Sequence, residues 1–543
     1  MLSGGPPARG KHPTLQAALA AAARSATGLT FLDARENERA LPFSEMYARA
    51  VRTAGALRER GVQRGDRVAI VLPTCVEFMD AFFGALYAGA VPVPLYPPVR
   101  LGRLEEFHRS TARMLRVSGA RIVLSDSRIS KFLGVALAEA GPELGLHRVE
   151  QGKPCEEMGA SNDLALIQFS SGTTVDPKPV ALTHANVLAN IAAIQTIVPD
   201  DDAQAGVSWL PLYHDMGLIG CLLLAVARPG PLTLLSPELF LGKPALWLRA
   251  ISKKRATLSV APNFAYGLCA RRIKDEELRG VDLSSWRFAL NGAEPVAPAV
   301  LRRFVERFAP HGFRESALMP VYGLSEASLA VTFTPAGRGP RFQSFGRRLA
   351  SVGAPLPGVD VDTRDGRIFV RGPSVMRGYF GNEDATRAVL CDSWLDTGDL
   401  GFIEDGELFV SGRAKEVIIL RGKNHAPQEF EDALDGLEGA RPGCAAAVAL
   451  PTPDGEELAL LVERNGELDE DQIRLRVLER TGIRAHEVRL LEPGTLPRTS
   501  SGKLRRGEAL RQLLAGELRA PQSVTLLHLA KEAARSALAR TLK

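Results

Sequence analysis

The segment Gln168-Phe-Ser-Ser-Gly-Thr-Thr-Val-Asp-Pro-Lys-Pro-Val-Ala-Leu-Thr-His184 decides how the rest of the chain is interpreted. The apolar run before it, from Leu164, predicts a strand that ends in a series of small residues. Gly172 allows a ligand to approach the backbone closely, and Lys178 adds a positive charge. Hydroxyls and successive N–H groups that suit phosphate oxygens come from Ser170, Ser171, Thr173 and Thr174. An ordinary hydroxyl-rich surface loop has the same composition, so the interpretation depends on the other segments.

The composition indicates a soluble protein of more than one domain. A chain of 543 residues is too long for a single core. The net charge of +5, from 67 basic and 62 acidic residues, is too balanced to indicate nucleic-acid binding. Six widely spaced cysteines without a C-x-x-C pair favour a reduced, cytoplasmic setting. The longest apolar stretch, 218–227, is shorter than the ~20 residues of a membrane span, and we expect the Gly/Pro-rich residues 1–12 to be unstructured.

Up to about residue 341, strand-like patterns alternate with helical ones. This alternation predicts parallel sheets covered by helices. The helical patterns include 44–60 and 300–308. The strand-like runs are at 67–72, 121–124, 207–212, 231–235, 256–260 and 287–290. The fold class is therefore α/β, with a large N-terminal domain of two helix-covered mixed sheets.

The sequence pattern changes towards the C-terminus. Short glycine-punctuated extended segments predict a β-rich subdomain at about 342–411, which completes an N-terminal domain of residues 1–412. A return to mixed patterns predicts a small α+β domain at 413–520, which the family resemblance described below implies to be mobile. The tail, 521–543, contains a basic amphipathic segment that lacks aromatic residues, so we expect a docked or solvated helix there and no membrane anchor.

Three predicted strands end in glycine-containing polar turns. They are followed by His214-Asp215, by Asn291-Gly-Ala-Glu294 and by Tyr322-Gly-Leu-Ser-Glu326. Strand ends of this kind on one sheet form the crevice in which α/β folds bind ligands. Tyr322 offers a flat face to a base, and Glu326 offers an oxygen ligand to Mg²⁺ beside a phosphate. The alternatives without a functional role are a hydrogen-bonded core histidine at His214 and a helix cap at Asp215.

Two further segments carry candidate ligand contacts. Asp399, in Asp396-Thr-Gly-Asp399, is a natural acceptor for paired ribose hydroxyls, and Arg413 reaches ribose or phosphate. Either residue alone is equally typical of a turn or a surface ion pair. Near the C-terminus, Lys503 follows a loop of small residues, where an isolated lysine would normally be a solvated charge.

In this order the segments resemble the motif set of the adenylate-forming superfamily, which includes acyl-CoA synthetases, luciferase and nonribosomal adenylation domains. The resemblance runs from about residue 14 to about residue 517 and is greatest to the fatty acyl-AMP ligases. The residues that carry it are Tyr96-Pro-Pro98, Trp209-Leu-Pro-Leu-Tyr-His-Asp-Met-Gly-Leu-Ile-Gly220, Pro262-Asn-Phe-Ala-Tyr266, Asn291-Gly-Ala-Glu-Pro295 and Arg421-Gly-Lys-Asn-His-Ala-Pro-Gln428.

The resemblance implies a two-step reaction with ATP and Mg²⁺ as cofactors. A fatty acid forms an acyl-AMP and pyrophosphate, and the acyl group then passes to the phosphopantetheine thiol of an acyl carrier protein, or to coenzyme A. It implies catalytic roles for Lys503, His214 and Glu326, with Glu326 as the metal ligand, and a hinge at Lys415. Cofactor binding is implied for Ser170, Ser171, Gly172, Thr173, Thr174, Lys178, Asn291, Gly292, Ala293, Glu294, Tyr322, Gly323, Ser325, Asp399 and Arg413.

Within this set, His214 would lie at the wall between ATP and the acyl chain, and Lys503 would bridge the carboxylate and the α-phosphate. Asn291 to Glu294 and Tyr322 would form the adenine pocket. Asp399 and Arg413 would contact the ribose, and Ser325 would supply the hydroxyl that many relatives carry before the glutamate.

Two departures from the family pattern keep other interpretations open. Val175 and Pro179 stand where the family loop has glycines, which predicts altered pyrophosphate handling. The connection 334–351 is shorter than the inserted segment that typical fatty acyl-AMP ligases carry, a segment associated with their inability to use coenzyme A. The alternatives are an acyl-CoA ligase of the same fold and a degenerate protein that only binds acyl or adenylate ligands. A P-loop kinase is excluded because the loop lacks Gly-Lys-Ser/Thr.

Overall fold

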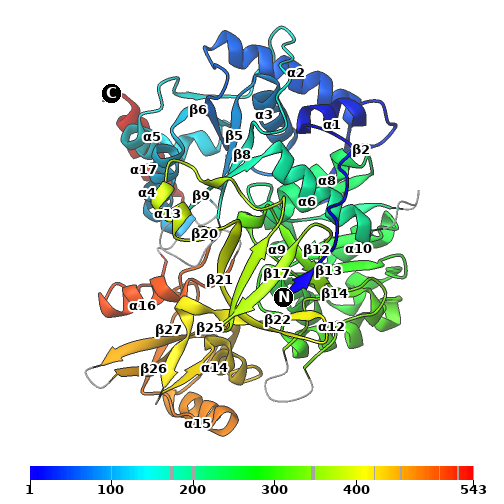
Figure 1. Ribbon diagram of the computed structural model, residues 1–543. Helices are drawn as coiled ribbons and strands as arrows, with labels where there is room; N and C mark the ends of the chain where they lie inside the picture. The colour runs from blue at the N-terminus through cyan, green and yellow to red at the C-terminus, as the bar shows by residue number, and fades with distance from the viewer. Residues whose placement is uncertain are drawn as a thin grey trace.

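The computed structural model describes residues 1–98, 101–170, 177–198, 204–343, 349–420, 422–452, 455–499, 502–521 and 525–541. It has a large N-terminal domain that contains several sheets and a smaller C-terminal domain, drawn from yellow to orange below it in Figure 1. The C-terminal helix, α17 (Leu526–Thr541), lies beside α4 (Leu104–Ser118) and α5 (Gly134–Ala140) of the large domain. The predicted α/β class is confirmed.

A nine-stranded sheet forms the centre of the large domain. Its inner strands are parallel and its edge strands antiparallel. In spatial order the strands are β16 (Ala354–Pro355), β15 (Ala330–Phe333), β14 (Leu318–Gly323), β13 (Phe288–Asn291), β12 (Leu258–Ala261), β10 (Gly206–Ser208), β11 (Leu232–Leu234), β2 (Gly28–Leu32) and β3 (Glu38–Pro42). The strands β10, β13 and β14, which precede the three predicted polar turns, therefore belong to one sheet.

The predicted strand 207–212 is shorter than expected, because β10 ends at Ser208. The apolar residues that follow it belong to a turn and are buried all the same. Trp209 stacks on Phe240 with ring centroids 3.9 Å apart, and Pro211 lacks the N–H that a strand pairing needs. Burial here reflects tertiary packing and is independent of strand structure.

A second, four-stranded sheet is entirely parallel and lies in the N-terminal part of the large domain. Its strands, in spatial order, are β5 (Val91–Leu95), β4 (Arg67–Val71), β6 (Ala120–Ser125) and β7 (Leu146–His147). Helices α2 (Phe43–Glu59) and α3 (Val76–Tyr87) flank β4 along the chain, and α4 precedes β6. Beside this sheet, β9 (Pro179–Thr183) pairs with β8 (Leu164–Phe169) on one side and with β19 (Gly378–Tyr379) on the other, so that Ser170 and Lys178 follow and precede the paired ends of β8 and β9.

A six-stranded antiparallel sheet contains both the first strand of the large domain and its last strands. It contains β17 (Asp360–Arg364), β18 (Arg367–Arg371), β20 (Leu390–Cys391), β21 (Trp394–Glu404) and β22 (Glu407–Arg413). Its sixth strand is β1 (Leu2–Ser3), which pairs with β17. The expectation that residues 1–12 are unstructured is therefore wrong for β1, because the free edge of β17 offers the pairing that the local sequence does not reveal.

The small domain has a hydrophobic core of its own. The strands β25 (Ala440–Thr452), β26 (Gly455–Arg464) and β27 (Glu487–Leu491) form its sheet. The hairpin β23 (Ile418–Leu420) and β24 (Lys423–His425) joins it to the large domain. Packing against the sheet comes from α14 (Pro427–Ala433), α15 (Glu470–Thr481) and α16 (Arg506–Leu514), with Phe430, Leu460, Val462 and Ile473 fully buried.

Helix α17 returns the chain to the large domain. The backbone N–H of Gly134, at the start of α5, donates to the hydroxyl of Ser536 at 2.6 Å. A Cβ at Gly134 would lie only 1.8 Å from the carbonyl oxygen of Ser536, so the two helices touch through their backbones. Arg535 pairs with Glu105 of α4 at 3.3 Å. The terminal segment is thus a docked helix, and among the described residues no helix has the length and apolar character needed to cross a membrane.

Candidate active site

The predicted strand ends meet at one large cavity of about 2450 Å³. The carboxyl ends of β10, β13 and β14 lie on one edge of the central sheet, as parallel neighbours must. Side chains from both domains line the cavity, among them Ser170, Lys178, Asp215, Glu294, Tyr322, Glu326, Asp399, Arg413 and Lys503.

The predicted phosphate loop is closed at its base by two hydrogen bonds. The N–H of Ser170 donates to the carbonyl of Lys178 at 2.9 Å, and the N–H of Lys178 donates to the Ser170 hydroxyl at 3.2 Å. The Lys178 ammonium lies 4.5 Å from the centre of the Tyr379 ring. Ser171, Gly172, Thr173, Thr174 and Val175 lie outside the described residues. Pro179 is the first residue of β9, a position that accommodates proline, and its carbonyl accepts from the N–H of Phe380 at 2.8 Å.

Tyr322, Asp399 and Arg413 form one connected chain along the cavity wall. The Tyr322 hydroxyl donates to Asp399 Oδ2 at 2.7 Å, and Arg413 Nε lies 3.0 Å from Asp399 Oδ1. The pairing of β21 with β22 places Asp399 directly opposite Arg413. Burial raises the pKa of Asp399, while Arg413 and the Tyr322 hydroxyl act to lower it. The chain fixes a carboxylate and a guanidinium where a sugar with paired hydroxyls would meet both.

Glu326 lies in a short turn after β14 and accepts a hydrogen bond from the Tyr379 hydroxyl at 2.9 Å. Burial raises the pKa of Glu326, although Tyr379, Arg413 and Lys178 act to lower it. A nearby divalent cation would stabilise the ionised form of such a half-buried carboxylate. Among the described residues, no three His, Cys, Asp or Glu side chains gather at one point. A single carboxylate suits Mg²⁺, which takes its remaining ligands from water and substrate phosphates.

The turn after β13 contains residues that line the cavity and residues that are buried behind its wall. Asn291 is fully buried behind the wall, where its amide donates to Asn263 Oδ1 at 3.3 Å. A Cβ at Gly292 would lie 2.8 Å from a methyl carbon of Val321, so glycine lets the ends of β13 and β14 approach. Ala293 has a φ of +71°, a strained conformation for a residue with a Cβ. Glu294 accepts from the N–H of Phe264 at 2.6 Å and lines the cavity.

Asp215 is not the helix cap that its position suggested. Helix α7 (Asp215–Gly217) begins at Asp215, and His214 occupies the capping position. One carboxylate oxygen of Asp215 accepts from the N–H of Met216 at 2.7 Å, and the other accepts from the Ser325 hydroxyl. The side chains of Asp215 and Ser325 therefore connect the ends of β10 and β14 across the intervening strands.

His214 lines a second hollow of about 1140 Å³, together with Ser170, Pro177 and Tyr213. Its ring centroid lies 4.9 Å from that of Tyr213. Burial lowers the pKa of His214 to about 4, Asp215 opposes this effect, and Lys503 adds to it. The imidazole is therefore neutral at physiological pH and contributes no positive charge to the site.

The neutral imidazole gives an expected pH dependence. Because the pKa of His214 lies at about 4, below its ordinary value of 6.5, the ring does not titrate between pH 5.5 and 8. The ratio of the wild-type adenylation rate to that of His214→Asn is expected to stay constant over this range, as measured by pyrophosphate release. A ratio that changes with a midpoint near pH 6.5 would show instead that His214 is protonated in the working enzyme.

Lys503 reaches the same cavity from the small domain. Its loop is held by a hydrogen bond from the Thr499 N–H to the Lys503 carbonyl at 2.8 Å and by one from the Lys503 N–H to the Thr499 hydroxyl at 3.0 Å. Burial lowers the pKa of Lys503, Asp215 and Glu294 raise it, and Arg413 lowers it further. Lys503 lines the cavity together with Asp215, Glu294 and Arg413, which come from three different strand ends of the large domain.

The expected hinge lies where pairing switches from one domain to the other. Lys415 is exposed in the short turn η8 (Ala414–Glu416). Two residues before it, Arg413 pairs with Asp399 of the large domain. Immediately after it, Glu416 pairs with Arg506 of the small domain at 2.7 Å. The backbone at Lys415 is therefore flanked by one residue anchored on each side.

Sequence reasoning missed several residues around the site. Tyr379 follows a glycine in a segment without a motif, and Asn263 lies in a segment of the family resemblance that gives it no role of its own. Arg103 and Glu106, which contact the small domain, carry no local signal because their partners lie about four hundred residues further along the chain. Only the pairing in space reveals them.

Comparison with known proteins shows the family to which the chain is similar. A sequence profile described as AMP-binding enzyme matches residues 19–380. A relative from Caulobacter vibrioides, provisionally named an acyl-CoA synthetase, is 36% identical over 551 residues, which cover 93% of this chain and 96% of the relative. The long-chain fatty-acid–AMP ligase FadD26 of Mycobacterium tuberculosis is 33% identical over 550 residues, covering 88% of this chain and 93% of the relative.

Solved structures extend the likeness to the whole fold. A chain from work on fatty acyl-adenylate ligases of E. coli and L. pneumophila superposes with a TM-score of 0.87 at 34% sequence identity. The match covers 94% of this chain and 99% of that chain. The likeness therefore includes both the large domain and the small domain.

Proposed function

The chain belongs to the AMP-binding enzyme family, whose members are adenylate-forming ligases, and from this premise we propose that it activates a fatty acid and loads it onto a carrier protein. In the first step a carboxylate oxygen of the fatty acid forms a bond to the α-phosphorus of ATP, and the bond to the pyrophosphate oxygen breaks. In the second step a phosphopantetheine thiol attacks the acyl carbonyl, loses its proton and releases AMP.

The observation that carries this proposal is the meeting of Lys503 with the Tyr322–Asp399–Arg413 chain at one cavity. Negative charge on the transferring phosphate is stabilised best by donors already in place in a site that excludes water. Lys503 supplies a cation, and the ordered Asp399 and Arg413 hold the ribose end of the nucleotide. Glu326 would hold Mg²⁺, which neutralises phosphate charge when it is bound.

The same cavity has an apolar part of its lining that would suit an acyl chain. This apolar lining includes Cys221, Leu224, Val207, Val260 and Leu268. Cys221 belongs to a π-helical turn, Leu218–Leu223, that follows α7 directly. Such turns are rare and occur mostly at functional sites, since the extra residue widens the helix locally. The turn supports a role for this stretch in shaping the acyl site next to Asp215.

The acceptor is the part of the function on which the relatives differ in name. FadD26 is named an AMP ligase, which supports a carrier protein as the final acceptor. The short connection 334–351 and the acyl-CoA synthetase name of the Caulobacter relative favour coenzyme A. In the described part of that connection, Arg341 pairs with Asp405 at 2.5 Å and Ser351 donates to Glu407 at 2.7 Å, so it packs against the β21–β22 hairpin.

The proposal is tested by giving the protein ATP, Mg²⁺ and fatty acids of graded length, and measuring acyl-AMP and pyrophosphate. Holo carrier protein and coenzyme A are then supplied in parallel reactions. We expect acyl-AMP with at least one acid, followed by thioester on the carrier protein. Thioester on coenzyme A alone would show that the acyl acceptor is coenzyme A and not a carrier protein. Binding of acyl-AMP without any turnover would identify the protein as a non-catalytic member of the family.

A further inference from the structure

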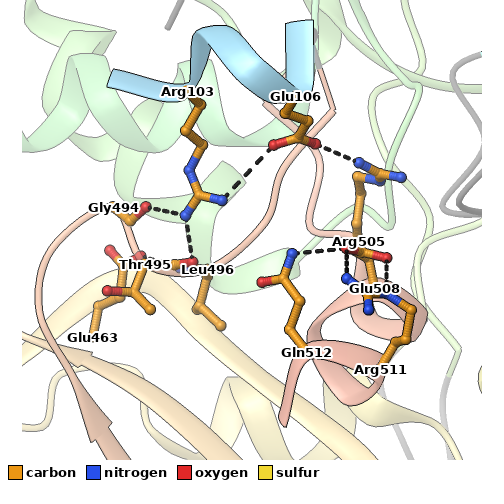
Figure 2. Close-up of polar contacts among 10 residues, drawn as sticks. All are labelled: Arg103, Glu106, Glu463, Gly494, Thr495, Leu496, Arg505, Glu508, Arg511 and Gln512. Atoms are coloured by element: carbon orange, nitrogen blue, oxygen red, sulfur yellow. Dashed lines mark hydrogen bonds and ion pairs between the residues drawn. The ribbon is translucent and has the colours of Figure 1, made fainter. Parts of the chain in front are cut away.

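Helix α4 of the large domain contacts the part of the small domain that carries Lys503. Arg103, in the short turn η1 (Leu101–Arg103) before α4, donates from Nη2 to the carbonyl oxygens of Gly494 at 3.1 Å and Thr495 at 2.8 Å. One turn later, Glu106 accepts from Nη1 of Arg505 at 2.8 Å. Figure 2 shows both side chains pointing from α4 towards the small domain.

These two contacts hold the Lys503 loop on both sides. Gly494 and Thr495 precede the loop, and Arg505 follows it by two residues. Between them the backbone folds back on itself, because the N–H of Arg505 donates to the carbonyl of Pro497 at 3.0 Å and Arg498 pairs with Leu504. Lys503 lies on the second arm of this hairpin, opposite Thr499, so fixing the two ends of the hairpin fixes its position.

Interactions within each domain hold the contacting residues in place. Within the large domain, Arg103 Nη1 lies 3.8 Å from Glu106 Oε2, which orients the two side chains together. Within the small domain, the buried Glu463 accepts from the N–H of Leu496 at 2.9 Å. Glu508 pairs with Arg511 and Gln512 on the first turns of α16 (Figure 2). The contact therefore joins two rigid surfaces.

Burial makes the contact costly to lose. The side chains of Arg103 and Arg505 are only 15% and 14% exposed, and Arg103 Nε is buried with no partner among the described residues. Removing one member of such a pair leaves the other charge poorly solvated, whereas an exposed pair contributes little. The chain offers an exposed pair for comparison, Glu105 with Arg535, on the neighbouring position of α4.

We propose that Arg103 and Glu106 are positioning residues for adenylation, which hold the Lys503 loop at the reaction centre and release it when the small domain moves for thioester formation. This inference rests on the two-step function proposed above. It makes the start of α4 a determinant of the balance between the two half-reactions, through the position of the Lys503 loop.

The test separates the two half-reactions in Glu106→Gln and Arg103→Met. Adenylation, followed by pyrophosphate release from ATP and fatty acid, is expected to slow by about 10- to 100-fold, since a small misplacement of a reacting group has effects of this size. Thioester formation from supplied acyl-AMP is expected to be unchanged or faster. The matched control, Glu105→Gln, is expected to leave both rates within about twofold. The exchanged pair Glu106→Arg with Arg505→Glu is expected to recover part of the adenylation rate.

A readout that needs no turnover distinguishes failure of this inference from failure of the proposed function. Amide hydrogen exchange in the segment 494–499 is expected to be faster in Glu106→Gln than in wild type, with exchange in the central sheet unchanged. Equal loss of both half-reactions, or no loss with unchanged exchange, would overturn the positioning role. If the wild-type protein forms no acyl-AMP, the proposed function fails, and the exchange comparison alone decides whether the contact holds the loop.

Discussion

Replacing Lys503 with alanine is expected to lower the adenylation rate by about 100- to 1,000-fold, the range seen when one preorganised donor is removed from a reaction centre. Lys503 lines the same cavity as Asp215, Glu294 and Asp399, and in the proposed mechanism its loss removes the cation that faces the phosphate and the carboxylate. Thioester formation from supplied acyl-AMP is expected to persist, because no phosphate charge develops in that step. Pyrophosphate release and thioester yield measure the two steps separately.

The lowered pKa of Lys503 adds a pH signature to this variant. The charged form is the active one, and its proton is lost as pH rises through a pKa below the ordinary lysine value. Wild-type adenylation is therefore expected to decline at alkaline pH earlier than an exposed lysine would allow, and Lys503→Arg is expected to decline later. Lys423→Ala, which alters an exposed lysine of β24 in the same domain, serves as the control. Adenylation by Lys503→Ala at the wild-type rate would refute the catalytic assignment.

Replacing Glu326 with glutamine is expected to lower the adenylation rate by about 10- to 100-fold and to raise the Mg²⁺ concentration that half-maximal activity requires. An amide has the size of the carboxylate but lacks its charge, so a metal ion held by Glu326 as proposed would be bound more weakly, without a cavity being opened. Burial raises the pKa of Glu326, which means that the ionised form is disfavoured in the folded protein. The variant is therefore expected to unfold at the same temperature as wild type or at a higher one.

Titration of pyrophosphate release with Mg²⁺ at fixed ATP measures this effect, and a chelator is expected to abolish activity in every variant. Tyr379→Phe is the matched control, since it removes only the hydroxyl that donates to Glu326 and leaves the carboxylate in place. A Glu326→Gln protein with the wild-type rate and the wild-type Mg²⁺ requirement would show that another group holds the metal.

Much of the fold was predictable because its signals are local. The alternation of apolar runs with helical patterns indicated the parallel strands, and the three strand ends indicated one edge of one sheet. Failures occurred where packing overrides the local pattern. The apolar residues Trp209 to Leu212 resemble a strand but form a buried turn, and Leu2–Ser3 looks unstructured but pairs with β17.

The candidate site shows the same division. Asp399, Arg413 and Lys503 were predicted as site residues from the order of the motifs in the chain, and all three line one cavity. The contacts that connect them were not predictable, because Tyr322 reaches Asp399 across 77 residues and Arg103 reaches Thr495 across 392. Asp215 illustrates the limit well, since its local position suggests a helix cap, whereas its partner is the distant Ser325.

The docking of α17 changes the connectivity of the small domain. Because Ser536 and Arg535 attach the last helix to the large domain, the small domain is an insertion with two covalent connections, one at Lys415 and one at residues 515–525. The second connection spans roughly 40 Å when fully extended, at about 3.5 Å per residue. While α17 stays docked, the end of α16 can move only within that radius of Leu526. A C-terminal truncation or fusion would therefore alter the range of motion available to the small domain.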